Sequence, residues 1–175
     1  MLLFITTIED DIIRSKLEII YEKYSGAMYG RAYAILENVS DAEDAVSDAF
    51  IRLFKNVDKI NDPASLETKG FAVIIAEHCA IDIYRKRKRL NESELDENIT
   101  AIPGNIEYVG DDKITAELFK LSSKYRNVLI LKYVQGYEYP DIAKMLDISE
   151  ENARKTGQRA KAKLEVLCRE QGLIC

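Results

Sequence analysis

Tyr139 to Leu164 reads YPDIAKMLDISEENARKTGQRAKAKL, in which a short apolar segment and a tight break precede a longer segment rich in Arg and Lys. Pro140 fits the first turn of a helix, because the N–H that proline lacks has no helical partner there. Asp147 and Ile148 then turn the chain, and Ser149 caps the next helix. This order predicts a helix-turn-helix, in which the second helix enters the major groove of DNA.

The second of these predicted helices has an apolar side and a polar side. Ala153, Ala160 and Leu164 recur at helical spacing and face inward. On the other side, Asn and Gln can pair with adenine, Arg and Lys can pair with guanine, and further cations can hold phosphates. The candidate DNA-contacting residues are Ser149, Asn152, Arg154, Lys155, Gln158, Arg159, Lys161 and Lys163. A solvated amphipathic helix is the alternative interpretation, and the preceding turn favours DNA binding.

The formal charge of the whole chain is -5, which raises the question of how the protein would approach DNA. Seven carboxylates lie in residues 91–112, which contain no Lys or Arg, and the rest of the chain carries about +2. This segment includes Pro103-Gly104-Asn105 and lacks a sustained helical period, so it predicts an acidic flexible linker between domains 1–90 and 113–175. It is either a solvated tether or an acidic strand that competes with nucleic acid. Because polyanion binding follows the local field, the net charge does not exclude DNA.

The N-terminal half has the apolar periodicity of three helices. The first covers about residues 10–37, with Gly26 as the candidate point of a break. Its apolar stripe is Ile13, Leu17, Ile20, Tyr24, Ala27, Met28 and Ile35. The third follows the turn at Asn61-Asp62-Pro63 and covers about Leu66 to Arg89. The chain is therefore predicted to be all-α, with two small helical domains.

The middle helix of this half carries a buried stripe and an acidic face. Ser40 and Glu43 match a capping box at its start. The stripe is Ala42, Ala45, Val46, Ala49, Phe50, Leu53, Phe54 and Val57. The polar face is Asp41, Glu43, Asp44, Asp48 and Arg52. The helix dipole explains acidic residues in the first turn but not Asp48, so a solvated face and a docking patch for a partner are equally supported by the residues alone.

The third helix ends in YRKRKR, Tyr84 to Arg89, with five cations in six residues. Cations are ordinary at the C-terminal end of a helix, because they meet the negative end of its dipole. Five are more than the dipole requires, which favours contact with phosphates.

Several classes of function lack support in the sequence. Cys79, Cys168 and Cys175 are widely spaced and odd in number, and His78 is the only histidine, so neither a disulfide framework nor a zinc site is indicated. There is no Gly-rich phosphate loop or hydrolase motif. The apolar run at residues 2–5 is too short for a signal peptide or a membrane span. We expect a cytoplasmic protein without membrane insertion, enzyme activity, metal or cofactor.

Taken in order, these motifs resemble the extracytoplasmic-function (ECF, group IV) sigma factors of bacterial RNA polymerase, over about residues 15–168. DAEDAVSDAFIRLF is similar to region 2.2, KGFAVIIAEHCAIDIYRKRKR to regions 2.3 and 2.4, and LSSKYRNVLILKYVQGYEYPDIAKMLDISEENARKTGQRAKAKL to region 4. The resemblance implies that region 2.2 binds the clamp helices of the polymerase beta-prime subunit, that regions 2.3 and 2.4 open and read the minus-10 element, and that region 4 reads the minus-35 element. The beta flap of core polymerase and an anti-sigma factor are further implied partners.

The resemblance also assigns residues to these surfaces. It favours docking over simple solvation for Asp44 and Asp48. The residues that it implies for the minus-10 DNA are Phe71, His78, Asp82, Arg85, Lys86, Arg87, Lys88 and Arg89.

Two departures from the family pattern carry expectations of their own. Where the family usually has W-L-Y-R-I-A-R-N, this chain has FAVIIAEH, so Ile74 and Glu77 stand for two arginines and His78 for an asparagine. We expect weaker attraction to DNA and an altered minus-10 preference or reduced melting. In region 4, Thr156 and Gly157 replace Arg and Leu, and a mid-helix Gly costs roughly 1 kcal/mol relative to Ala. The recognition helix is therefore expected to be locally soft until it is bound.

The function expected from this resemblance is that of an alternative sigma factor, which binds core polymerase and directs promoter-specific initiation. The alternative is a stand-alone helix-turn-helix regulator that binds an operator without polymerase. Such a regulator should dimerise on a palindromic site, whereas a sigma factor should be monomeric and need core enzyme for specificity.

Overall fold

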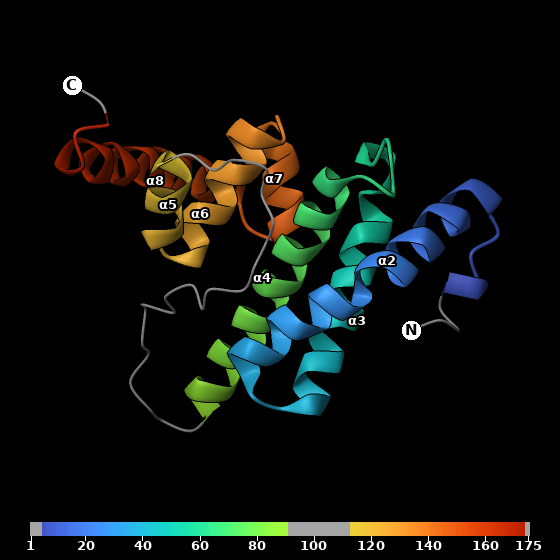
Figure 1. Ribbon diagram of the computed structural model, residues 1–175. Helices are drawn as coiled ribbons and strands as arrows, with labels where there is room; N and C mark the ends of the chain where they lie inside the picture. The colour runs from blue at the N-terminus through green and yellow to red at the C-terminus, as the bar shows by residue number, and fades with distance from the viewer. Residues whose placement is uncertain (1–4, 91–112, 174–175) are drawn as a thin grey trace. The chain divides into compact units, whose positions relative to one another are not determined.

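The computed structural model of the chain describes residues 5–90 and 113–173, and all regular elements within those ranges are helical. The chain divides into two compact units, residues 1–95 and 96–175, which are described separately below. The point of division falls within the predicted linker, residues 91–112. These residues lie outside those that the structure describes. The all-α prediction is confirmed for the described part of the chain (Figure 1).

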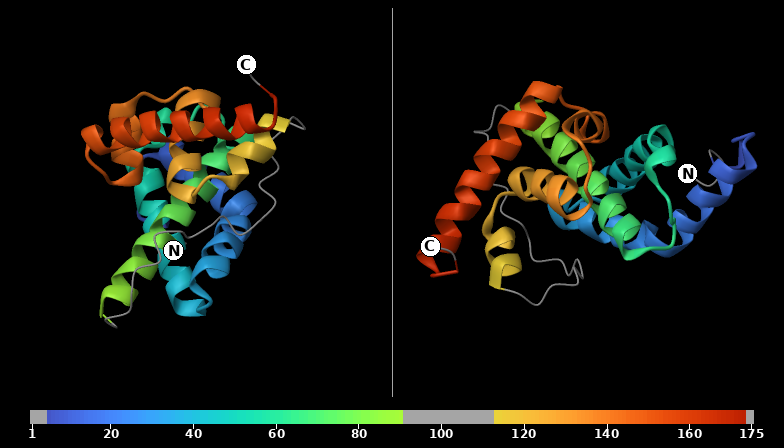
Figure 2. Two further views of the ribbon diagram at one scale, coloured as in Figure 1. Left: turned by 90° about the vertical axis from the view of Figure 1, so that its left-hand side faces the viewer. Right: turned by 90° about the horizontal axis from the view of Figure 1, so that it is seen from above.

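Three long helices build the first unit, in agreement with the predicted periodicity. They are α2 (Asp11–Leu36), α3 (Val39–Lys55) and α4 (Leu66–Leu90), with a short 3-10 turn, η1 (Val57–Lys59), after α3. Each long helix packs against the other two (Figures 1 and 2). The candidate break at Gly26 is absent, because α2 continues through that residue to Leu36.

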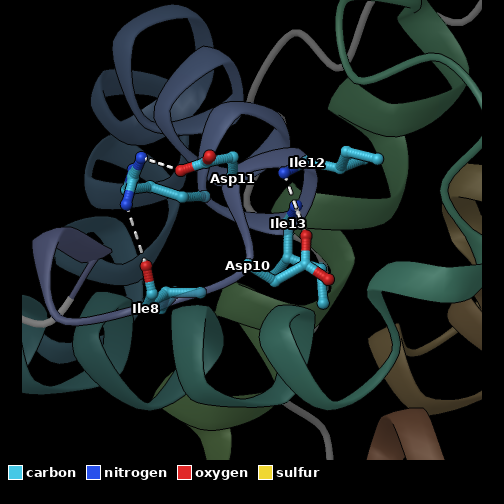
Figure 3. Close-up of polar contacts among 6 residues, drawn as sticks. Ile8, Asp10, Asp11, Ile12 and Ile13 are labelled. Atoms are coloured by element: carbon cyan, nitrogen blue, oxygen red, sulfur yellow. Dashed lines mark hydrogen bonds and ion pairs between the residues drawn. The ribbon is translucent and has the colours of Figure 1, made fainter.

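The start of α2 is fixed by side-chain contacts (Figure 3). Asp10 is the N-cap, and its carboxylate accepts hydrogen bonds from the backbone N–H of Ile12 at 2.9 Å and of Ile13 at 3.1 Å. Arg14 donates to the carbonyl of Ile8 at 3.0 Å and pairs with Asp11. The two contacts of Asp10 satisfy backbone donors that a helix start leaves without partners.

The start of α3 differs from the predicted capping box. The N-cap is Asn38, whose side-chain oxygen accepts from the N–H of Asp41 at 3.0 Å, and Ser40 already lies inside the first turn. Glu37 takes a left-handed conformation (φ 50°) that ends α2. The two helices are therefore separated by only two residues, and asparagine takes the cap because it stands one step before the helix.

The core of the first unit follows most of the predicted stripes. Its fully buried side chains include Leu17, Ile20, Met28, Phe50, Leu53, Phe71, Ile74 and Ile75. Ala27 and Phe54 were predicted to be inside, but both are exposed. The buried stripe of α3 ends at Leu53, and Val57 completes it from η1 because the chain leaves the α-helix at Lys55.

The second unit contains four α-helices and a π-helical turn. In chain order they are α5 (Lys113–Lys120), α6 (Ser123–Leu129), the π turn η2 (Ile130–Val134), α7 (Tyr139–Leu146) and α8 (Glu150–Glu170). The apolar pattern of Val128, Leu129, Leu131 and Tyr133 predicts one helix from Tyr125 to Val134. The structure instead has α6 followed by a wider turn, and Tyr133 is 60% exposed. A glycine at position 136 predicts the end of this segment, and Gly136 follows it in a left-handed conformation (φ 76°). Helices α5, α6 and α7 all pack against α8 (Figure 2).

The predicted helix-turn-helix is confirmed in α7 and α8. Asp147 adopts a left-handed conformation (φ 52°), and the N–H of Ile148 donates to the carbonyl of Ala143 at 2.9 Å. Ser149 caps α8, because its side-chain oxygen accepts from the N–H of Asn152 at 3.2 Å. The half-buried Ile148 lies at the angle between the two helices.

Two kinds of feature are absent from residues 5–90 and 113–173. No helix in those ranges is both long and apolar enough to span a membrane. Nor do the described ranges hold a group of three or more side chains able to bind a metal ion.

Candidate polymerase and DNA interfaces

The outer face of α8 presents all the residues predicted to contact DNA. Ser149, Asn152, Arg154, Lys155, Gln158, Arg159, Lys161 and Lys163 are each exposed. The inner face is formed by Ala153, Thr156, Gly157 and Ala160, with Leu164 half-buried. The prediction of one polar and one packed face is therefore confirmed, while the DNA contacts themselves remain a prediction.

Arg154 is held in place by contacts on two sides. Its guanidinium pairs with Glu150 at 2.6 Å and lies over the ring of Tyr139, 5.4 Å from the centroid. The ammonium of Lys132 lies over the same ring at 5.3 Å. Burial raises the pKa of Tyr139, and contact with Tyr133 adds to that rise, while the two cations oppose it. Tyr139 therefore stays neutral and serves as an aromatic platform for cations.

Gly157 is the reason that Tyr139 can take this position. A methyl group at Gly157 would lie 2.5 Å from the Tyr139 hydroxyl and 2.8 Å from its Cε1 atom, both well inside van der Waals contact. Helix α8 runs without interruption through Gly157. The expectation that the helix is locally soft here is therefore unsupported in the structure, because the glycine serves a close approach between α7 and α8.

The next cations of α8 are also paired with carboxylates one turn away. Lys155 pairs with Glu151 at 2.6 Å, and Lys161 lies 3.9 Å from Glu165. All four side chains are exposed, so these pairs are weak and exchange readily for other partners.

The acidic face of α3 is partly free and partly engaged. Glu43, Asp44 and Asp48 are exposed, as a docking surface requires. Asp41 instead pairs with Arg87 of α4, with Oδ2 and Nη1 2.7 Å apart. One residue predicted to dock the polymerase is thus paired with one predicted to bind DNA.

The same face of α3 continues into two apolar side chains that sequence reasoning placed elsewhere or overlooked. Ile51 is 41% exposed and Phe54 is 36% exposed. Ile51 follows Asp44 and Asp48 at helical spacing of seven and three residues. That spacing is the signal that could have identified a mixed acidic and apolar surface.

Arg52, predicted for docking, turns toward α4 and joins a polar cluster. It lies 3.3 Å from Nδ1 of His78 and 3.3 Å from Oδ2 of Asp82, and His78 lies 3.2 Å from Asp82. Burial raises the pKa of Asp82, but the hydrogen bonds and charges of His78 and Arg52 outweigh it, so the pKa is lowered. The structure thus brings together three predicted site residues from two helices.

The altered region 2.3 lies largely inside the first unit. Phe71 is 1% exposed and Glu77 is fully buried, and Ile74 is also in the core. Glu77 pairs with Arg31 of α2 at 2.5 Å. The expected weaker attraction to DNA stays a prediction, because the two arginines of the family pattern are absent, although Glu77 itself is buried and paired with Arg31. The contact of Phe71 with DNA that the resemblance implies is not available in this conformation.

The cationic end of α4 is accessible in part. Lys86 and Arg87 are exposed, while Arg85 and Lys88 are half-buried. The ammonium of Lys88 lies 5.2 Å from the centroid of the Tyr84 ring. The side chain of Arg89 lies outside the described residues.

Comparison with known proteins matches both units in order. The model of Sigma-70 region 2 matches residues 20–90, and that of Sigma-70, region 4 matches residues 111–164. The ECF RNA polymerase sigma factor SigW of Bacillus subtilis (strain 168) is 30% identical over 146 residues, which cover 74% of this chain and 76% of the relative. The chain belongs to the family of ECF RNA polymerase sigma factors.

One further relative and one solved structure are similar to this sigma factor. The ECF RNA polymerase sigma factor SigX of Bacillus subtilis (strain 168) is 24% identical over 168 residues, covering 90% of this chain and 84% of the relative. Among solved structures, the co-crystal structure of the sigma factor RpoE in complex with the anti-sigma factor NepR from Bartonella quintana is 21% identical, with a TM-score of 0.43. The matched region covers 91% of this chain and 97% of the RpoE chain.

In this sigma factor, the region 2 match includes α3 and α4, and the region 4 match includes the helix-turn-helix. Sequence reasoning identified both surfaces but missed the carboxylates paired with the cations of α8. Glu150 and Glu151 precede Arg154 and Lys155 by four residues, the spacing of a helical ion pair.

Proposed function

We propose that this ECF sigma factor binds core RNA polymerase and directs it to a restricted set of promoters. The observation that carries the proposal is the order of two surfaces along one chain: an acidic helical face followed by a cationic helix end in the first unit, and a cationic recognition helix in the second. Each lies within the matching sigma region. The factor would act by binding and positioning, without chemistry of its own.

The first unit supplies the contacts with polymerase and with the minus-10 DNA in this proposal. Asp44 and Asp48, exposed on α3, meet the clamp helices of the beta-prime subunit, and Ile51 and Phe54 extend the contact with apolar area. The cationic end of α4 holds phosphates near the minus-10 element. Because Asp48 lies beyond the first turn of α3, helix capping alone does not account for it.

The second unit reads the minus-35 element through α8, which its helix-turn-helix geometry favours. Asn152, Gln158 and Arg159 are exposed and can face base edges or phosphates. The side-chain oxygen of Asn152 accepts from the Thr156 hydroxyl at 3.3 Å, which leaves its amide nitrogen for DNA. The beta flap of core polymerase and an anti-sigma factor that covers both units are further proposed partners. The proposed site of action is the cytoplasm, where such a polymerase works.

Run-off transcription with cognate core polymerase tests this function on a library of genomic upstream fragments. Specific transcripts that require the protein, and that vanish with Asp44→Lys plus Asp48→Lys, are the expected result. A matched pair of control changes, Glu22→Lys plus Asp58→Lys, alters the charge equally at exposed sites away from this face. Equal loss with both pairs, or no binding of core enzyme by the wild type, would refute the docking role.

The stand-alone regulator is less well supported, because the chain shares both sigma regions rather than the helix-turn-helix alone. Tight binding to a palindromic site in the absence of core polymerase, together with a dimer in solution, would support the stand-alone regulator instead.

A further inference from the structure

We propose that Glu150 and Arg154 together read a single C·G base pair of the minus-35 element, which makes Glu150 a specificity-determining residue. Glu150 is the first residue of α8, and the N-terminal residues of a recognition helix are those that contact base edges. The proposal rests on the proposed function, since it takes α8 as the helix that enters the major groove.

The pair is organised before any DNA is bound. The carboxylate of Glu150 and the guanidinium of Arg154 are 2.6 Å apart, and the Cζ atom of the guanidinium lies 5.4 Å from the ring centroid of Tyr139. Tyr139 is in turn seated against Gly157, where no side chain could fit beside it. The reading arginine is thus fixed through α7 and α8 together, which reduces the conformational entropy lost on binding.

The chemistry of this pair matches the major-groove edge of a C·G base pair. Cytosine N4 presents a donor, and guanine O6 and N7 present acceptors beside it. Cytosine N4 and guanine O6 are themselves hydrogen-bonded, so they lie about 2.9 Å apart. A carboxylate oxygen and a guanidinium nitrogen 2.6 Å apart present the complementary acceptor and donor at nearly the same spacing.

Both members of the pair keep enough hydrogen-bonding capacity to bind the bases. A guanidinium has five N–H donors, and the ion pair with Glu150 engages only its Nη2 atom. A carboxylate accepts several hydrogen bonds, so Glu150 can hold Arg154 and still accept from cytosine N4. An A·T pair also presents a donor, adenine N6, beside an acceptor, thymine O4, but it offers the guanidinium one acceptor there instead of the two, O6 and N7, that guanine presents. The bidentate arginine contact is therefore lost on an A·T or T·A pair.

The neighbouring pair, Glu151 and Lys155, provides an internal comparison. It has the same spacing and the same distance of 2.6 Å. Lysine, however, is a point charge rather than a planar fork, and among the described residues Lys155 makes no contact with an aromatic ring. We therefore expect Lys155 to hold a phosphate, and Glu151 to contribute little to base preference.

The test is a selection in which the minus-35 element of a transcribed promoter is randomised. Run-off transcription uses the full-length protein and core polymerase, and sequencing gives the base preference at each position. The wild type should favour C·G at one position by about tenfold. Glu150→Gln should lose that preference in favour of adenine, which glutamine pairs with bidentately, and should leave the other positions unchanged. Glu151→Gln is the matched control and should retain the wild-type pattern.

Two results would overturn the proposal: an unchanged preference in Glu150→Gln, or the same loss in Glu151→Gln. The same three proteins are also used, without polymerase, to select duplexes from the randomised pool. If this second selection shows loss of the C·G preference in Glu150→Gln while no protein supports transcription, the sigma function fails and the base-reading role stands. If transcription requires the wild type but neither selection distinguishes Glu150→Gln from it, only the base-reading role fails.

Discussion

At the scale of single residues, Gly157 lies against the Tyr139 ring, so an added methyl group would force that ring to shift. Gly157→Ala should lower the free energy of unfolding by about 1–3 kcal/mol, the usual result of overpacking. This loss should appear even though alanine is the better helix former by about 1 kcal/mol. Thermal unfolding followed by circular dichroism measures the change.

Gly30→Ala in α2 is the matched control for this substitution. Gly30 is exposed, and a methyl group there would meet nothing within 4 Å. This variant should be as stable as the wild type or more stable, by up to about 1 kcal/mol. A Gly157→Ala protein that behaves like Gly30→Ala would show that Tyr139 moves aside without cost.

The carboxylate of Asp82 predicts a dependence of stability on pH. Because its folded pKa lies below the ordinary 3.8, it contributes stability that is complete above that value and disappears as the pH falls through the lowered pKa. Asp82→Asn should therefore be less stable than the wild type near neutral pH, and the difference should vanish in acid. Urea unfolding at a series of pH values tests this expectation, and a difference that stays constant into acid would contradict it.

At the scale of elements, the start of α3 offers a test of which residue caps the helix. Asn38→Ala removes the side chain that accepts from the N–H of Asp41, and should cost about 1 kcal/mol. Ser40→Ala should change the stability by less than about 0.5 kcal/mol, because Ser40 lies inside the exposed first turn. A larger loss of stability in Ser40→Ala than in Asn38→Ala, measured by chemical unfolding, would instead support the capping box predicted from the sequence.

The elements themselves were largely predictable from apolar periodicity, as in α3, α4 and the helix-turn-helix. Their exact ends were less so, because Asn38 and Ser40 are both good capping residues and only the path of the chain selects between them. The π turn at Ile130–Val134 was also missed, since its apolar pattern resembles that of a continuing helix.

The candidate sites show the same division between local and long-range information. The exposed cations of α8 follow from helical spacing alone. By contrast, the contacts Asp41 with Arg87, Arg31 with Glu77, and Tyr139 with Gly157 join residues on different helices. No periodicity within one helix reports such a partner, which is why the sequence did not indicate that Glu77 is buried or that Gly157 lies against the Tyr139 ring.

At the scale of the whole molecule, the distribution of charge predicts how the free protein meets DNA. Replacing the seven carboxylates of residues 91–112 by their amides should strengthen binding of the free protein to single-stranded DNA at low salt. The gain should fade toward physiological salt, where the screening length is about 8 Å. Fluorescence anisotropy across a salt series measures this, and equal affinity of both proteins at every salt concentration would identify the segment as a simple tether.

The ion pair between Asp41 and Arg87 has a consequence for genetic mapping of this factor. Each side chain neutralises the other at 2.7 Å, so a substitution at either position liberates its neighbour as well as removing itself. If Asp41 takes part in the proposed docking of polymerase, a change at Asp41 would weaken that docking and would also release the guanidinium of Arg87 for DNA. Mutations that suppress an Asp41 defect would therefore be found among the proposed DNA-binding residues of α4. Their positions would reflect the ion pair between Asp41 and Arg87 within one protein, and not a contact between two proteins.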